Sequence, residues 1–325
     1  MTQSQLAGAA TAALGGGRRL EGIERLAGGT RKGVYRLTMD DATTAIAYLW
    51  EDSESYWPAA EGDDDLTDPF SPGVGLYLFE AAHARLDTLG LRVPALHLID
   101  RDRTYYPADL AIVEDFPGEN LMALLDRDPR AAEPTMARLA EALEAMRGHR
   151  APAHGKVALV DEGGRSRGTS CEADVLDFAL RCLAEAASRD QRIAGARDRL
   201  EERLRVLAAA VQPRAEYSVI HGELGLEHVL VDGDGNPVLI DTEDLMYFDV
   251  EWEHVFLRIR LHDDYRRLAV DGLDEDRLAL YMLAQRLSLT AGPLRLLDGD
   301  FPNREFMQEI AEHNLNEALA LVSAE

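Results

Sequence analysis

The amino-acid sequence predicts an α+β fold, in which a small β-rich N-terminal part precedes a larger and mainly helical part. Three short stretches near the N-terminus alternate apolar and polar side chains, as strands of an antiparallel meander do, at residues 20–27, 34–39 and 44–50. Further along, residues 119–211 and 251–325 place apolar side chains at helical spacing instead. A length of 325 residues allows one large or two medium domains.

The segment after the meander differs in character from its neighbours. Residues 51–75 are polar, acidic and interrupted by proline, which predicts a surface insertion or a mobile loop. Residues 76–89 then carry an apolar face at helical spacing with Glu80 beside it, and Gly90 ends this predicted helix.

A chain breaker suggests where the first domain ends. Two more strand-like stretches, at residues 95–100 and 109–114, are followed by Phe116-Pro117-Gly118, which is typical of a linker. We therefore expect an N-terminal domain over residues 1–115 and a C-terminal domain over residues 116–325.

The second domain is expected to hold several long amphipathic helices around one buried hairpin. Helical periodicity is clear at residues 134–147 and 173–210, on either side of a loop rich in Gly, Ser and Arg at 162–170. Residues 217–241 return briefly to a strand pattern, with a turn at 232–237.

Composition and charge narrow the class of protein. The apolar fraction of 46% and the charged fraction of 29% are ordinary for a soluble protein and exclude disordered, collagenous and membrane classes. A net charge of −25 disfavours nucleic acid and anionic membranes as partners and favours cationic or metal-bound ones, although the acidity also fits a bias of the source genome. Two unclustered cysteines, Cys171 and Cys182, and a start without a signal-peptide pattern predict a cytoplasmic protein without disulfides.

Lysine is scarce in this sequence. Of the 34 basic residues, only Lys32 and Lys156 are lysines. Any mechanism that requires a lysine therefore has two candidates.

The densest group of chemically capable side chains lies in residues 217–249. An apolar strand leads to His221-Gly222-Glu223, and the hairpin that follows should bring Glu223, His228 and Asp241 to the same end. Acidic and imidazole groups that converge at strand ends suit a divalent cation and a general base. The alternative is that these side chains only cap loops and form the turn.

These residues resemble a family pattern. The catalytic segment of aminoglycoside phosphotransferases and choline kinases, which have a protein-kinase-like fold, reads His-Gly-Asp, four residues, Asn, a hairpin and Ile-Asp; this chain has HGELGLEH and later VLID with the same spacing. Three further segments are similar: RLAGGTRKGVYRLTM to the glycine-rich hairpin, IVEDFPGENL to the hinge, and FDVEWEHVFL, with Asp249 and Glu253, to the acidic segment downstream.

The resemblance implies a bilobal protein-kinase-like fold and a small-molecule kinase that uses ATP or GTP with Mg²⁺, or Mn²⁺. It implies catalytic roles for Glu223 and His221, and metal ligation by Asp241 and His228. It also implies nucleotide binding by a glycine-rich turn, a helix glutamate and a hinge, comprising Gly28, Gly29, Thr30, Arg31, Lys32, Gly33, Glu80, Glu114, Asp115 and Phe116.

Two site residues depart from the family pattern. Glu223 replaces an aspartate, and the extra methylene moves the carboxylate by roughly 1.5 Å, although its basicity is similar. His228 replaces an asparagine, and imidazole suits Mn²⁺ or Zn²⁺ better than Mg²⁺, so His228 either changes the second metal site or only forms a loop hydrogen bond.

The largest departure is the missing lysine of the third strand. Residues 44–50 offer Tyr48 or Ala47 where the family has the basic residue that holds the phosphates and pairs with the helix glutamate. Our hypothesis is that Lys32, with Arg31 beside it, supplies this cation from the glycine-rich turn. Solvated turn charges are the alternative.

The function that we expect is phosphorylation of a hydroxyl group on a small acceptor such as an antibiotic or another amino-bearing natural product. Acidic residues recur in the C-terminal part where related antibiotic kinases bind cationic acceptors: Glu119, Asp174, Asp177, Asp263, Asp264, Glu309, Glu312 and Glu317. A solvated helix face explains each of them equally well. The competing hypotheses are a pseudokinase that binds nucleotide without phosphotransfer, and a binding module for another ligand.

Overall fold

A computed structural model describes residues 2–27, 29–58 and 64–323. Its contacts divide the chain into two compact units that are each discontinuous in sequence. Unit 1 comprises Met1–Trp57, Gly73–Leu139 and Leu226–Glu243; unit 2 comprises Pro58–Pro72, Ala140–Gly225 and Asp244–Glu325.

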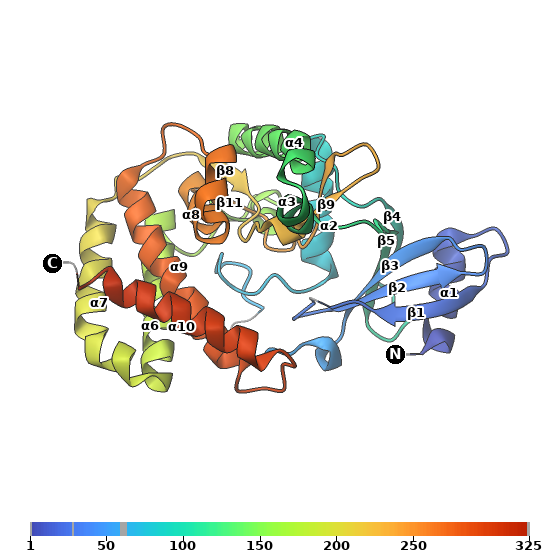
Figure 1. Ribbon diagram of the computed structural model, residues 1–325, viewed down its shortest axis with the longest axis horizontal. Coiled ribbons are helices and arrows are strands. Elements are labelled where there is room, and N and C mark those ends of the chain that lie inside the picture. Colours follow the sequence, from blue (N-terminus) through green and yellow to red (C-terminus); the bar gives the residue numbers. More distant parts are fainter. Residues whose placement is uncertain (1, 28, 59–63, 324–325) are drawn as a thin grey trace. The chain divides into compact units, whose positions relative to one another are not determined.

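Unit 1 is built on a five-stranded antiparallel sheet in the order β1-β2-β3-β5-β4 (Figure 1). The strands are β1 (Leu20–Arg25), β2 (Gly33–Met39), β3 (Thr44–Trp50), β4 (Leu96–Asp100) and β5 (Asp109–Glu114). All five were expected from the sequence pattern, and the antiparallel meander predicted for the first three strands is confirmed in β1 to β3. A separate two-stranded hairpin joins β9 (Val229–Val231) to β10 (Pro237–Leu239).

Helices cover both faces of this sheet. α1 (Gln3–Leu14) packs Leu6, Ala9 and Ala10 against one face, and α2 (Leu76–Thr88) packs Leu76 and Phe79 against the other. This explains the burial along the strands: β2 alternates between buried and half-buried side chains, whereas β3 is buried on both faces from its second residue onward. The sequence patterns predicted α2 but not α1, because α1 consists largely of small residues with a weakly apolar face.

Three further helical segments complete unit 1. They are η1 (Asp52–Glu54), α3 (Leu121–Arg127) and η2 (Leu226–His228). The long helix α4 (Pro129–Gly148) begins in unit 1 and ends in unit 2.

Unit 2 combines a small sheet with a group of long helices. Its four short strands pair in the order β6-β8-β11-β7, from β6 (Arg150–Ala151), β7 (Gly155–Lys156), β8 (Tyr217–Ile220) and β11 (Met246–Phe248). The helices are α5 (Val157–Val160), α6 (Cys171–Arg189), α7 (Gln191–Ala210), α8 (Val250–Leu261), η3 (His262–Arg267), α9 (Glu275–Leu296) and α10 (Arg304–Ala320). α9 packs against α6, α7, α8 and α10 (Figure 1).

The stretch with helical periodicity at residues 173–210 forms two helices, α6 and α7. Asp190 separates α6 from α7, and its side chain accepts a hydrogen bond from the Arg192 backbone N–H at 2.8 Å, which caps the second helix. Cys171 and Cys182 both lie on α6 as buried free thiols, as expected. No helix in the described part of the chain is long and apolar enough to cross a membrane.

Residues 64–72, part of the predicted surface insertion or mobile loop, make specific contacts within unit 2. The Phe70 ring stacks on Phe178 with ring centres 4.3 Å apart, and it also lies 4.8 Å from the ring of Trp252. Asp68 pairs with Arg167 at 2.9 Å and with Arg181 at 2.7 Å. Of the two predicted alternatives, these contacts favour an insertion that packs on unit 2.

Candidate functional site

The loop His221–Leu224 follows β8 in unit 2 and is held by its backbone. One carboxylate, that of Glu253 on α8, accepts hydrogen bonds from the N–H groups of His221 at 2.6 Å, Gly222 at 3.0 Å and Leu224 at 3.1 Å. The Glu253 side chain is 2% exposed. Because this carboxylate is buried and accepts three hydrogen bonds, it holds the backbone of the loop firmly in place.

Two further features shape this loop. The Trp252 indole N–H donates to the carbonyl of Gly222 at 3.1 Å. Gly222 has a φ of +97°, and a Cβ at this position would lie 3.1 Å from the Asp244 carbonyl oxygen, so any other residue would be strained there. Within the loop, His221 is buried whereas Glu223 is exposed, so the carboxylate that was predicted as a base reaches solvent from a fixed backbone.

The hairpin β9–β10 in unit 1 brings His228 and Asp241 together, as the sequence predicted. His228 ends η2 before β9 and Asp241 follows β10, and their side chains approach to 3.6 Å between Nε2 and Oδ2. Asp241 adopts a φ of +59°, which is unusual for a residue other than glycine and is typical of functional positions. Glu223 belongs to unit 2, so only two of the three expected side chains share one unit.

Lys32 lies at the start of β2 and contacts the same carboxylate. Its Nζ donates to Asp241 Oδ1 at 2.8 Å and also to Glu243 Oε1. Burial alone would lower the pKa of Lys32, but Asp241 and Glu243 outweigh that effect and raise it above its ordinary value. Lys32 therefore keeps its positive charge although it is only 8% exposed.

The glycine-rich turn around Lys32 is tightly folded. A Cβ on Gly29 would lie 2.5 Å from the carbonyl oxygen of Lys32, so only glycine fits there. The Thr30 carbonyl accepts a hydrogen bond from the Tyr56 N–H at 2.9 Å, and the Arg31 guanidinium lies 4.4 Å from the centre of the Trp57 ring. Gly28 lies outside the described residues.

Close approach also explains the last glycine of this turn. A Cβ on Gly33 would lie 2.8 Å from both the Glu54 carboxylate and the Tyr35 ring. The backbone itself excludes a side chain at Gly29, whereas at Gly33 a side chain would have to displace Glu54 and Tyr35.

The predicted hinge residues are engaged in ion pairs within unit 1. Glu114 ends β5 and accepts hydrogen bonds from Arg92 at 2.6 and 2.7 Å. Asp115 accepts two from Arg36, at 2.7 and 3.1 Å, and the Phe116 ring lies 5.2 Å from the Arg92 guanidinium. These contacts fix the segment that leaves the sheet.

Glu80, the predicted partner of a nucleotide-binding lysine, is engaged elsewhere. Its carboxylate accepts hydrogen bonds from Arg101 Nε at 2.7 Å and from Arg101 Nη2 at 2.5 Å. The ion pairs described for Lys32 are with Asp241 and Glu243.

Two side chains at this end of the hairpin, those of Asp241 and His228, could contribute ligands to a metal ion. Among the described residues, no group of three or more His, Cys, Asp and Glu side chains is arranged to hold a metal on its own. Asp241, whose side chain is 51% exposed, offers carboxylate oxygens, with the His228 imidazole beside it. Such a set fits an ion that takes its remaining ligands from phosphate and water, which is how Mg²⁺ is usually bound at nucleotide sites.

The sequence did not single out two residues that the structure brings into prominence. Glu243 is buried and pairs with Lys32, and Trp252 binds the Gly222 carbonyl. For Glu243 a usable signal existed, since a second acid two residues after Asp241 follows a buried strand in VLIDTED. For Trp252 there was none, because indole N–H partners are not encoded in spacing.

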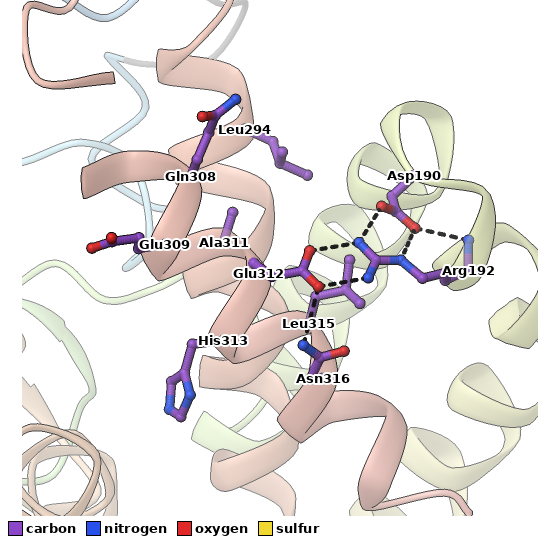
Figure 2. A pocket seen from close by; sticks show the side chains of 10 residues that line it. All are labelled: Asp190, Arg192, Leu294, Gln308, Glu309, Ala311, Glu312, His313, Leu315 and Asn316. Carbon is purple, nitrogen blue, oxygen red and sulfur yellow. Dashed lines mark hydrogen bonds and ion pairs between the residues drawn. The ribbon is translucent and has the colours of Figure 1, made fainter. Parts of the chain in front are cut away.

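A shallow hollow of about 650 Å³ lies elsewhere in unit 2, lined by α9, α10 and the start of α7 (Figure 2). Two of the acidic residues considered for a cationic acceptor, Glu309 and Glu312, line it. Figure 2 shows the Arg192 guanidinium between Glu312 and Asp190, at 2.7 and 2.8 Å from their oxygens. The charge of Glu312 is therefore balanced within the chain.

Other acids of that group also have internal partners. Asp174 accepts hydrogen bonds from Ser166 at 2.6 Å and is 2.8 Å from His154 Nε2, and Glu119 pairs with Arg127. Their use inside the fold favours a structural role for these acids.

Comparison with known proteins places the chain in a family context. A sequence profile of the phosphotransferase enzyme family matches residues 23–289. No curated protein matches the sequence.

Solved structures show what the fold is similar to. A thermostable mutant of aminoglycoside phosphotransferase APH(4)-Ia, in a ternary complex with AMP-PNP and hygromycin B, matches with a TM-score of 0.62 and 14% identity over 96% of this chain and 98% of that one. Choline kinase LicA from Streptococcus pneumoniae matches with a TM-score of 0.61 and 14% identity, over 98% and 97% of the two chains.

A putative fructosamine-3-kinase from Thermobifida fusca matches with a TM-score of 0.54 and 20% identity, over 98% of this chain and all of that one. The α+β, protein-kinase-like fold that the sequence motifs implied is thus confirmed.

Proposed function

Because the chain belongs to the phosphotransferase enzyme family, we propose that it transfers the γ-phosphoryl group of ATP or GTP to a hydroxyl group of a small molecule. The observation that carries this proposal is the ion pair between Lys32 and Asp241, which are 209 residues apart in sequence. It joins a cation from a glycine-rich turn to an acid at a hairpin end, and phosphoryl transfer depends chiefly on such charged groups for positioning and charge neutralisation.

Each site residue has a distinct task in this proposal. Glu223 accepts the proton of the acceptor hydroxyl as the oxygen attacks the γ-phosphorus, while the bond to the bridging oxygen breaks and the nucleoside diphosphate leaves. His221, being buried, positions the loop. Lys32 and the turn Gly28–Gly33 bind phosphate oxygens, and Glu114–Phe116 contact the base.

Asp241, with His228 beside it, would hold Mg²⁺ or Mn²⁺, and the bound ion would supply charge neutralisation at the phosphates. Asp241 contributes a carboxylate that is already oriented by Lys32. His228 contributes its imidazole to the same end of the hairpin.

The acceptor class that we propose is an antibiotic or another amino-bearing natural product. The net charge of −25 supports it, because an acidic protein attracts cationic ligands over a distance. The related structure bound to hygromycin B supports it as well.

Thermal unfolding with added nucleotide tests the first half of the proposal. ATP or GTP with Mg²⁺ or Mn²⁺ should raise the Tm in a concentration-dependent manner, since a ligand that binds only the native state stabilises it. An unchanged Tm with every pair would contradict nucleotide binding.

Release of nucleoside diphosphate in the presence of hydroxylated amino compounds tests the second half. We expect turnover with at least one acceptor, and a loss on the order of 10²-fold or more in Glu223→Gln, because the base is removed. A rise in Tm combined with equal, background turnover in wild type and variant would favour a pseudokinase instead. Two features of the sequence favour the pseudokinase: β3 has no lysine, and Glu223 stands where the family pattern has an aspartate.

A further inference from the structure

Lys32 reaches the place that a basic residue on β3 would otherwise occupy. Its Nζ lies 5.1 Å from the centre of the Tyr48 ring, and Tyr48 is one of the two β3 residues, with Ala47, that stand where the family pattern has lysine. The amine therefore lies beside the side chain of a β3 residue although the Lys32 backbone precedes β2.

If Lys32 replaces a lysine on β3, a residue other than the glutamate of α2 has to hold its side chain in place. A lysine side chain has a flexible four-carbon stem, so its amine is useful for phosphate binding only if another group fixes it. Glu80 on α2 does not contact Lys32 in an ion pair, since Arg101 binds its carboxylate with two hydrogen bonds. The buried carboxylate that does bind Lys32 is Glu243, whose side chain is 4% exposed.

Asp241 would be a weaker anchor than Glu243 if it also ligated a metal ion. A carboxylate that ligates a metal ion shares its oxygens with the ion, which weakens its hold on a neighbouring ammonium group. An ammonium group has three donors. If Glu243 keeps one of them, the other two would be available to phosphate oxygens while Asp241 held a metal ion.

Resting on the proposed function, we infer that Glu243 is the positioning residue that anchors Lys32 for phosphate binding, in place of Glu80. The pair is confined to unit 1 and links the residue before β2 to the second residue after Asp241. The exchange of both partners explains how the chain dispenses with a lysine on β3.

Calorimetric titration of ATP with Mg²⁺ into wild type, Glu243→Gln and Glu80→Gln tests this inference. We expect Glu243→Gln to weaken ATP binding by about tenfold or more, because Lys32 loses its charged partner, which corresponds to about 1.4 kcal/mol. Glu80→Gln, the matched control, should stay within about twofold of wild type. If Glu243 acted only by repelling the phosphates of ATP, removal of its charge would tighten ATP binding. Unchanged or tighter ATP binding by Glu243→Gln therefore overturns the inference.

The double variant Lys32→Met/Glu243→Gln separates anchoring from a general loss of stability. Compared with Lys32→Met alone, the added Glu243→Gln change should not weaken ATP binding further, since the residue to be anchored is gone. Equal weakening in both backgrounds would contradict the inference.

Two controls make failures distinguishable. Glu243→Asp keeps the charge and should retain more affinity than Glu243→Gln, so it replaces that variant if Glu243→Gln does not fold. Affinity equal to wild type in Lys32→Met would also contradict the inference. If wild type itself binds no nucleotide, the proposed function is wrong and the inference falls with it. If wild type binds and Glu243→Gln binds equally well, only the inference is wrong.

Discussion

Glu253 on α8 holds the candidate catalytic loop through three hydrogen bonds. Its two oxygens accept from three backbone N–H groups, those of His221, Gly222 and Leu224. The position of the exposed Glu223 therefore depends on a carboxylate 30 residues further along the chain, on α8.

Glu253→Gln should lower both stability and activity. A glutamine has one acceptor oxygen in place of two, so at least one buried N–H loses its partner, at a cost of about 1–3 kcal/mol in the free energy of unfolding. A shift of the loop by about 1 Å can reduce turnover on the order of 10²-fold. Urea denaturation and steady-state turnover measure the two effects.

The matched control is Glu202→Gln, which makes the same chemical change on an exposed residue of α7. Its free energy of unfolding should stay within about 0.5 kcal/mol of wild type. If Glu253→Gln is as stable and as active as this control, Glu253 does not fix the loop.

At the scale of single residues, the sequence predicted which residues lie in the candidate site better than it predicted their ion-pair partners. Comparison with a family pattern singled out Glu223, His228, Asp241 and Lys32, and three of these, Lys32, Asp241 and His228, do lie together. It did not reveal that Glu80 pairs with Arg101 or that Glu243 pairs with Lys32, because ion pairs between distant segments depend on the tertiary fold.

Among the helices, α8 contains a buried histidine that should make stability depend on pH. Burial, with Arg147 and Arg258 nearby, lowers the pKa of His254 to about 4 from an ordinary value of 6.5. Between these two values the unfolded chain binds a proton that the folded chain does not, so stability falls as the pH falls from about 6.5.

Urea denaturation of wild type and His254→Gln at pH 7 and pH 5 measures this dependence. Wild type should lose about 2 kcal/mol more than the variant between the two pH values, from about 1.36 kcal/mol per pKa unit. Parallel losses in both proteins would show that His254 is not the group responsible.

For the secondary-structure elements, periodicity was an adequate guide where helices and strands have one polar face. It predicted β1 to β5 and α2, but it did not locate the boundary between α6 and α7, since the capping aspartate between them does not interrupt the apolar spacing. It also missed α1, whose buried residues include two alanines. The contacts of residues 64–72 could not be predicted, because the packing of Phe70 depends on aromatic partners far away in sequence.

Each of the two units contains a segment whose neighbours in sequence belong to the other unit. Residues 226–243 belong to unit 1 although the sequence assigns them to the helical part, and residues 58–72 belong to unit 2 although they lie between β3 and α2. The first segment is tied into unit 1 by backbone contacts, in which Leu239 donates to the Arg92 carbonyl and Leu230 bridges to Asn120. Such long-range backbone pairing leaves no periodic trace in a sequence.

That residues 226–243 belong to unit 1 matters for the proposed binding of a nucleotide. It places Asp241 and Glu243 in the same unit as the turn that carries Lys32, so that a cation and two acids from remote segments form one cluster. The phosphates of a nucleotide would meet this cluster within unit 1.

Calorimetric titration of ATP with Mg²⁺ into wild type and Lys32→Met tests that claim most directly. The account predicts that wild type binds ATP and that the variant, which keeps an apolar stem over Tyr48 but lacks the charge, binds at least about tenfold more weakly, since hydrogen bonds between charged groups contribute about 1.5–3 kcal/mol. Equal affinity of the two proteins, or no binding by wild type, would contradict it.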